Sequence, residues 1–142
     1  MKTARGVAGD RGMIYLASPY SHAQHEVRER RFEMACRATA QLIHAGQPAF
    51  SPIVHSHPLV RFGLPTDWEF WQRCDRALMS CCREIVVLQL DGWRESRGVQ
   101  AEIDLAIDMD LPVRYLPAEM ISNWSGGDTN MSVRPSSQET SI

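Results

Sequence analysis

The amino-acid sequence predicts a single α/β domain built around a parallel β-sheet. Short apolar runs rich in β-forming residues alternate with longer amphipathic stretches of helical period. This alternation requires parallel strands joined by right-handed helical crossovers. The 142 residues, 44% of them hydrophobic, are enough for one core. Four strands can be counted along the chain, at residues 13–17, 48–52, 84–90 and 111–116.

The first strand and the first helix are the most clearly marked elements. Met-Ile-Tyr-Leu-Ala at 13–17 is a buried strand that ends abruptly at Ser18-Pro19-Tyr20-Ser21. Residues 26–45 follow as a long amphipathic helix, which Gly46 stops. Arginines cover one face of this helix, and we expect its buried stripe at Phe32, Cys36, Thr39 and Ile43.

A short strand and a second helix come next. Residues 48–52 form the strand, and a long loop is expected over residues 53–65. Thr66 or Asp67 caps the second helix. Its two tryptophans are three positions apart and share one face, where core packing is favoured over stacking on a ligand. The apolar positions of this helix are Trp68, Trp71, Leu78 and Met79.

The polar stretch after the third strand connects residues 84–90 to a helix over residues 98–108. Parallel sheets bind ligands at the carboxyl ends of their strands, where such loops lie. Gly98 permits close backbone approach, and the free N–H groups of the first helical turn attract anions. Glu102 stands one turn into the helix. It is either a surface residue favoured by the helix dipole or a reactive carboxylate aimed into the crevice.

Charge and cysteine usage exclude several protein classes. With 15 basic and 17 acidic residues, the chain lacks the excess of positive charge that binds a nucleic-acid polymer or an anionic membrane. No apolar run approaches the ~20 residues that span a bilayer, and the start lacks the apolar core of a secretory signal. No CxxC pair occurs, so reduced thiols in a cytoplasmic protein are expected. The cysteines are Cys36, Cys74, Cys81 and Cys82, the last two packing at a helix end.

The domain is expected to span residues 13–124. Residues 1–12 are polar and Gly-rich and are predicted to be a mobile leader, with Met13 as an alternative start of translation. Residues 125–142 have the composition of a disordered tail.

His55 and His57 form an HxH pair of the kind that can ligate zinc. No third ligand follows at a recognisable spacing, so neither a metal nor another cofactor is expected. The pair lies after the second strand, at the same edge of the sheet as the other loops. The two residues either line a base pocket or are ordinary loop histidines.

Three motifs in order resemble the nucleoside 2-deoxyribosyltransferase superfamily, which includes the 2′-deoxynucleoside 5′-monophosphate N-glycosidases. They are Tyr-Leu-Ala-Ser-Pro at 15–19, Asp75 just before the third strand, and Ser-x-Gly-x-x-x-Glu-x-x-x-Ala at 96–106. The resemblance covers residues 13–117 and is nearest to a small bacterial branch with no assigned function. It implies a flavodoxin-like (Rossmann-like) three-layer sandwich with a four- or five-stranded sheet, whose fifth strand would lie near residues 119–124.

The same resemblance implies catalytic roles. Glu102 would attack the anomeric carbon and hold a glycosyl intermediate, beside Tyr15. Asp75 would orient or protonate the departing base, although a surface Asp75 paired with a neighbouring arginine is an alternative reading. The chemistry is consistent, because a carboxylate stabilises the positive charge that develops on the sugar and a second carboxyl group assists the leaving nitrogen.

The resemblance also implies substrate-binding residues. Ser96 and Gly98 match a Ser-x-Gly that binds a 5′-phosphate, and Ser18 and Pro19 would line the same site. Where the transferases carry Asp before Gly-Thr, this chain has Arg97, so Asp91 is a candidate stand-in for that acid. Arg94 and Arg97 either favour a phosphate or are solvated loop charges.

Two classes of function follow from these residues. The first is an N-glycosidase or deoxyribosyltransferase that acts on a (deoxy)nucleoside or nucleotide through a glutamate nucleophile. The second is a non-catalytic nucleotide-binding or sensing module on the same fold. Because a neighbouring subunit often completes the site in this superfamily, a homodimer or larger homo-oligomer is expected.

Overall fold

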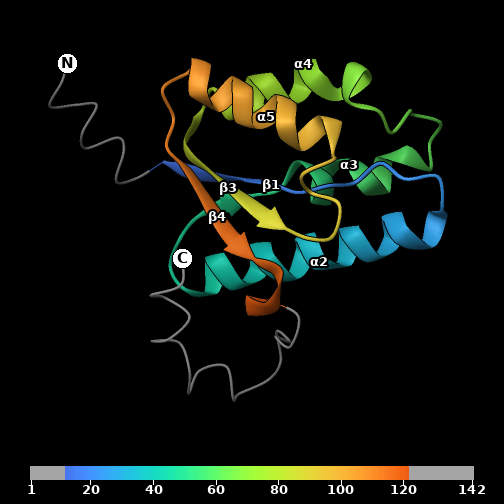
Figure 1. The fold of residues 1–142 in the computed structure, drawn as a ribbon, viewed down its shortest axis with the longest axis horizontal. Coiled ribbons are helices and arrows are strands. Elements are labelled where there is room, and N and C mark those ends of the chain that lie inside the picture. The colour runs from blue at the N-terminus through green and yellow to red at the C-terminus, as the bar shows by residue number, and fades with distance from the viewer. Residues whose placement is uncertain (1–11, 122–142) are drawn as a thin grey trace, which may run out of the picture.

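The computed structural model describes residues 12–121, in which strands and helices alternate as predicted (Figure 1). The expectations for a leader and a tail fall on residues 1–11 and 122–142, outside this range. In chain order the elements are β1 Met13–Ala17, α2 His25–His44, β2 Ala49–Phe50, α3 Pro52–Val60, α4 Trp68–Met79, β3 Cys82–Gln89, α5 Arg97–Asp108, β4 Val113–Pro117 and the 3-10 turn Ala118–Met120.

The sheet is entirely parallel, with the strand order β2-β1-β3-β4. β1 and β3 form its centre and are paired from Ile14↔Glu84 to Ala17↔Val87. This is the order of a flavodoxin-like sheet, and the predicted α/β class is confirmed. Between residues 12 and 121 the sheet has four strands, and residues 118–120 form a 3-10 turn where the sequence allowed for a fifth.

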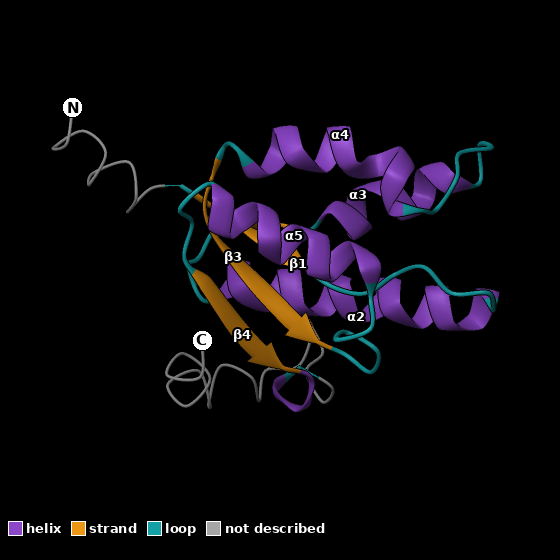
Figure 2. Cartoon of the chain, turned by 45° about the horizontal axis from the view of Figure 1, so that its top comes forward, coloured by secondary structure: helices purple, strands orange, loops and turns teal. Residues whose placement is uncertain are grey.

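The helices cover the sheet on both faces, with α2 on one side and α4 and α5 on the other (Figures 1 and 2). Alternate residues of the central strands therefore contribute to two different cores. The core beneath α2 includes Ile14, Leu16, Val86, Leu88, Ala38 and Leu42. The core beneath α4 and α5 includes Tyr15, Ala17, Ile85, Val87, Met79, Val99 and Ala106.

The stripe predicted for α2 is wrong by about one position. The helix buries Ala35, Ala38 and Leu42, together with the polar Gln41, whereas Ile43 is 54% exposed. The small alanine side chains let the helix backbone lie close to the sheet. Since alanine is only weakly hydrophobic, the sequence pattern favoured the neighbouring stripe of larger side chains.

The loop predicted over residues 53–65 is also wrong in its first half, because α3 occupies Pro52–Val60. The helix is started by Ser51, whose side chain accepts a hydrogen bond from the Val54 N–H at 3.2 Å. Proline at the first helical position is a second start signal. The sequence analysis predicted a strand over residues 48–52, which wrongly included Ser51 and Pro52 at the start of this helix.

The other two helices on the site side also begin with a side-chain cap, of which the one at Asp67 was predicted. Asp67 caps α4 by accepting from the Phe70 N–H at 3.2 Å, and Ser96 caps α5 by accepting from the Val99 N–H at 3.2 Å.

The end of α4 packs against two cysteines, as predicted. Cys82 is the first residue of β3 and is buried there, and its thiol lies 3.4 Å from the Leu78 carbonyl of α4. The Cys81 thiol lies 3.7 Å from the Ala77 carbonyl of the same helix. All four cysteines are free thiols. Within residues 12–121, no helix combines the length and apolar character needed to cross a membrane.

Candidate active site

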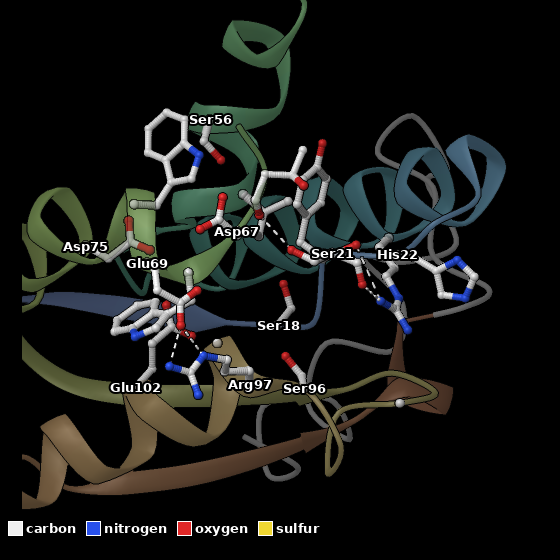
Figure 3. A pocket seen from close by; sticks show the side chains of 18 of the residues that line it. Ser18, Ser21, His22, Ser56, Asp67, Glu69, Asp75, Ser96, Arg97 and Glu102 are labelled. Carbon is white, nitrogen blue, oxygen red and sulfur yellow. Dashed lines mark hydrogen bonds and ion pairs between the residues drawn. The ribbon is translucent and has the colours of Figure 1, made fainter. Parts of the chain in front are cut away.

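A cavity of about 380 Å³ opens at the carboxyl ends of β1 and β3. Its walls come from the loop after β1, from α3 and α4, and from the loop that leads into α5 (Figure 3). In the order β2-β1-β3-β4, the crossovers from β1 and β3 leave toward opposite faces of the sheet. Parallel α/β sheets bind their ligands at such a switch point, and the volume suits a small molecule.

Glu102 lies at the floor of this cavity and is only 5% exposed. It shares the inward face of α5 with Val99, Leu105 and Ala106, so the packing of the helix against the sheet carries the carboxyl group inside. The hydroxyl group of Tyr15, a fully buried residue of β1, donates a hydrogen bond to the Glu102 carboxylate. The structure therefore joins two predicted site residues that are 87 positions apart in the chain.

Burial dominates the acidity of this glutamate. Removal from water raises the pKa of Glu102 to about 8, because the charged form loses its hydration. The hydrogen bond from Tyr15 acts in the opposite direction and lowers that pKa, whereas the nearby charge of Asp75 raises it. The pKa of Tyr15 is raised well above its usual value, first by burial and then by Glu102. Tyr15 therefore acts as a hydrogen-bond donor that keeps its proton.

Asp75 lies on α4, half-buried in the wall of the same cavity. Burial raises its pKa to about 6. It forms no hydrogen bond or ion pair with another residue between 12 and 121, so the alternative of a surface pair with an arginine is not seen. Two carboxyl groups of raised pKa, on different helices, thus face one cavity.

The start of α5 forms a polar wall with Ser18. The Ser18 hydroxyl lines the cavity, is 5% exposed as a residue, and has no hydrogen-bond partner in the described part of the chain. Ser96 and Gly98 lie beside it at the first turn of the helix. A side chain on Gly98 would project into space that holds only the Ser96 hydroxyl, at 3.9 Å. These three residues leave room for an anion near the helix N-terminus.

Arg97 lines the cavity at its rim and forms an ion pair with Glu69 of α4 (Figure 3). Both side chains are more than half exposed. The pair connects the starts of α4 and α5 across the opening. The positive charge of Arg97 is thus matched by a carboxylate in the absence of a ligand.

Five of the predicted residues are not among those that line this cavity, and Tyr15 is one of them, since it meets the site through its hydrogen bond to Glu102. Asp91 is exposed and lines a neighbouring hollow, and its carbonyl accepts from Arg31 Nη2 at 3.2 Å. Pro19 is buried, and His55 is exposed on α3. His57 acts only indirectly, because its ring contacts a residue of the cavity wall.

That indirect contact is a chain of hydrogen bonds. His57 Nδ1 lies 2.6 Å from the Tyr20 hydroxyl, and His57 Nε2 lies 2.8 Å from the Glu29 carboxylate. Tyr20 lines the cavity, so these bonds orient part of its wall. No group of three potential metal ligands is found within residues 12–121.

Two tryptophans placed in the core by the sequence line the cavity instead. Trp68 and Trp71 are half-buried, and neither belongs to the two core clusters. The indole N–H of Trp71 donates to the Pro65 carbonyl at 2.7 Å, which fixes its ring. The spacing of Trp68, Trp71 and Asp75 is i, i+3, i+7, so one helix face carries all three. Their shared helix face is the feature of the sequence that could have indicated that all three lie at the cavity.

Tyr20 and Arg31 are among the further wall residues that sequence reasoning missed. Tyr20 follows the first strand, and Arg31 comes from the first turns of α2. The Arg31 guanidinium donates to the carbonyls of Ser21 at 2.9 Å and Asp91 at 3.2 Å, which ties the two loops of the site together. No periodic or motif signal distinguishes Arg31 from the other arginines of that helix.

Comparison with known proteins identifies a family whose function is unknown. None of the curated proteins matches this sequence. A family model described as a domain of unknown function, DUF1937, matches residues 12–117, which includes every strand of the sheet and every wall of the cavity. The chain therefore belongs to the DUF1937 family.

Proposed function

We propose that this protein cleaves or exchanges the N-glycosidic bond of a nucleotide or nucleoside, with Glu102 as the nucleophile. The observation that carries the proposal is the buried Glu102–Tyr15 pair at the floor of a cavity whose wall supplies a second carboxyl group, Asp75. The motifs that hold these residues support placement in the nucleoside 2-deoxyribosyltransferase superfamily, as an N-glycosidase or a deoxyribosyltransferase.

The two carboxyl groups suit the two halves of the reaction. The ionised Glu102 attacks C1′ of the sugar while the C1′–N bond breaks, and the electron pair of that bond stays with the base. Protonated Asp75 gives its proton to the departing nitrogen. Water or a second base then attacks C1′, gives up its proton to Asp75, and releases Glu102 as a carboxylate. Tyr15 holds the attacking oxygen in place through its hydrogen bond.

The pKa of Glu102 is the observation that favours the alternative, a non-catalytic nucleotide-binding or sensing module. With a pKa of about 8 the carboxyl group is mostly protonated at neutral pH, which suits a hydrogen-bonding role as well as a nucleophilic one. Measurement of turnover separates the two functions, because both predict that a nucleotide binds.

We expect the wild-type protein to release free base from a nucleoside monophosphate, and to bind that nucleotide at least about tenfold more tightly than the nucleoside. The phosphate would accept from Ser18, Ser96 and the first N–H groups of α5. Chromatography measures the base, and titration calorimetry measures the affinities. Ser18→Ala should reduce the difference between the two ligands, because it removes a buried hydroxyl that has no other partner.

Two results would contradict this expectation separately. Equal affinities for the nucleoside and its monophosphate would remove the phosphate from the proposal and leave a nucleoside site. Tight binding of the nucleotide with no base released from any nucleoside or nucleotide tested would instead favour the sensing module.

The dependence of kcat/KM on pH should be bell-shaped, with limbs near pH 6 and pH 8. The active form has Glu102 ionised and Asp75 protonated, although Asp75 is the stronger acid of the two. The two pKa values differ by about two units, so about one free enzyme molecule in a hundred has Glu102 ionised and Asp75 protonated at the optimum. The limbs belong to the coupled pair, so they are assigned to both groups together.

Initial rates at low substrate concentration across this pH range measure the profile. A kcat/KM that does not fall at alkaline pH but continues to rise above pH 8 would show that Asp75 donates no proton. The ionisation of Glu102 would then be the only step that sets the dependence of the rate on pH.

A further inference from the structure

The cavity wall carries more acidic than basic side chains. Two guanidinium groups, those of Arg31 and Arg97, lie among the lining residues. Five carboxyl groups lie there with them, from Asp67, Glu69, Asp75, Glu95 and Glu102. A cavity of this composition favours a ligand with positive charge over part of its surface.

Only some of these charges are matched by a partner. Arg97 is paired with Glu69, and Asp67 accepts from the first turn of α4. Glu102 accepts from the neutral hydroxyl group of Tyr15. The remaining two, Asp75 and Glu95, have no hydrogen bond or ion pair with any residue in the described range. The unmatched acidic groups thus lie on both α4 and the loop before α5.

Aromatic rings occupy the same side of the cavity as Asp75. Trp71 lies three residues after Trp68 and four residues before Asp75 along α4, so the rings and the carboxyl group share one helix face. The hydrogen bond from Trp71 to the Pro65 carbonyl holds its indole in a set orientation. Indole faces attract cations, most strongly where water is excluded.

We propose that the ligand of this cavity is an N-glycoside whose aromatic base carries a positive charge on its ring, as in a pyridinium nucleotide or a 7-alkylated purine nucleotide. The base would lie against Trp68 and Trp71 beside Asp75, and the sugar would lie over Glu102. The proposal rests on the function proposed above and names the class of substrate.

A cationic base removes the need for an acid in the first step. When Glu102 attacks C1′, the electron pair of the C1′–N bond neutralises the ring nitrogen of a pyridinium, and the base departs uncharged without a proton. The carboxylate becomes a neutral glycosyl ester at the same time, so the positive charge of the substrate and the negative charge of Glu102 disappear together. Water then attacks C1′, Asp75 accepts its proton, and the ester electrons return to Glu102 as a carboxylate.

The electrostatics of the floor agree with this ligand class. Glu102 and Asp75 are both held toward their neutral forms by burial. A cation bound next to them favours their ionised forms, because opposite charges at short range lower the pKa of a carboxyl group. The substrate itself would thus generate the nucleophile, and binding should release a proton to the buffer.

The test compares closely related ligands in which one member carries a positive charge on the ring and the other does not. Titration calorimetry at mildly alkaline pH would use nicotinamide mononucleotide and its reduced, uncharged 1,4-dihydro form. A second pair at mildly acidic pH would use 7-methylguanosine 5′-monophosphate and guanosine 5′-monophosphate. We expect the cation to bind at least about tenfold more tightly in one pair or both, and the pair that discriminates identifies the type of base. Equal or weaker binding of the cation in both pairs overturns the proposal.

Charge variants away from the reacting atoms make the test specific. Glu95→Gln should reduce the preference for the cation, whereas Asp108→Asn makes the same charge change at the opposite end of α5 and should leave that preference unchanged. Trp71→Leu should also reduce the preference for the cation, whereas Trp71→Phe should retain part of that preference because an aromatic ring remains. If Glu95→Gln and Asp108→Asn have equal effects, overall charge explains the preference and the proposed site is wrong.

Single-turnover release of base separates this proposal from the proposed function. Asp75→Asn should slow release from a neutral nucleotide by about 10²–10⁴-fold, and should slow release from a pyridinium nucleotide much less. Equal losses for both substrates contradict the cationic mechanism. Preference for the cation with no release of base from any substrate contradicts the enzymatic function alone, and release from neutral nucleotides without any charge preference contradicts the present inference alone.

Discussion

Glu102→Gln should lower the turnover of a nucleotide substrate by several orders of magnitude while leaving the fold and ligand binding in place. The amide keeps the shape of the side chain and can still accept the hydrogen bond from Tyr15, but it cannot form the glycosyl ester. Losses of this size are typical when a covalent catalyst is removed. Rates of base release and calorimetric affinities, measured on the same preparation, test both halves of the expectation.

A slow substrate with fluorine at C2′ should label the wild-type protein on the peptide that carries Glu102, as shown by mass spectrometry. The matched control is Asp108→Asn, which removes a carboxyl group from the exposed far end of the same helix and should retain the label. An active Glu102→Gln protein, or a label on another peptide, would return Glu102 to a purely structural role.

Glu102→Gln should also become more stable than the wild-type protein as the pH rises. A carboxyl group whose folded-state pKa is raised contributes stability that is fully present below its unfolded-state pKa and lost as the pH rises through the folded value. For Glu102 this window runs from about 4.5 to about 8. The loss across it amounts to about 5 kcal/mol, because each pKa unit corresponds to about 1.4 kcal/mol. Glutamine does not ionise, so the variant avoids this loss.

Thermal or denaturant unfolding of both proteins at several pH values measures the effect. The difference in unfolding free energy between variant and wild type should grow in favour of the variant from pH 4.5 to above pH 8 and then level off. Asp108→Asn, at an exposed position on the same helix, should follow the wild type. A difference that is independent of pH would show that Glu102 is ionised at ordinary cost, and would contradict the raised pKa regardless of what the protein catalyses.

Local signals in the sequence determined the architecture. The apolar runs at β1 and β3 form buried strands, and the alternation of strands with helices requires a parallel sheet. Asp67 and Ser96 cap their helices as short-range rules predict, since a cap depends only on residues within one turn. The spacing of Val99, Ile103 and Ala106 likewise predicts the amphipathic helix that became α5.

Relations between distant segments required the tertiary structure. The spacing in the sequence left Glu102 as either a surface or a buried group, and the decision came from Tyr15, on another element of the sheet. Arg97 finds its counter-charge in Glu69 of α4, whereas the sequence left it as either a phosphate ligand or a solvated charge. Asp91 lies outside the cavity, although the sequence made it a candidate for an acid of the site.

The faces of the helices show the same division. Periodicity defines a stripe but not what lies opposite it, so the larger side chains of α2 were taken for its core and the tryptophans of α4 for core residues. Packing decided otherwise, because alanines fit α2 closely to the sheet, whereas Trp68, Trp71 and Asp75 border the cavity that opens beyond the strand ends. The sequence alone determined the alternation of strands and helices, α3 excepted, and the packing of those elements decided which side chains meet at the site.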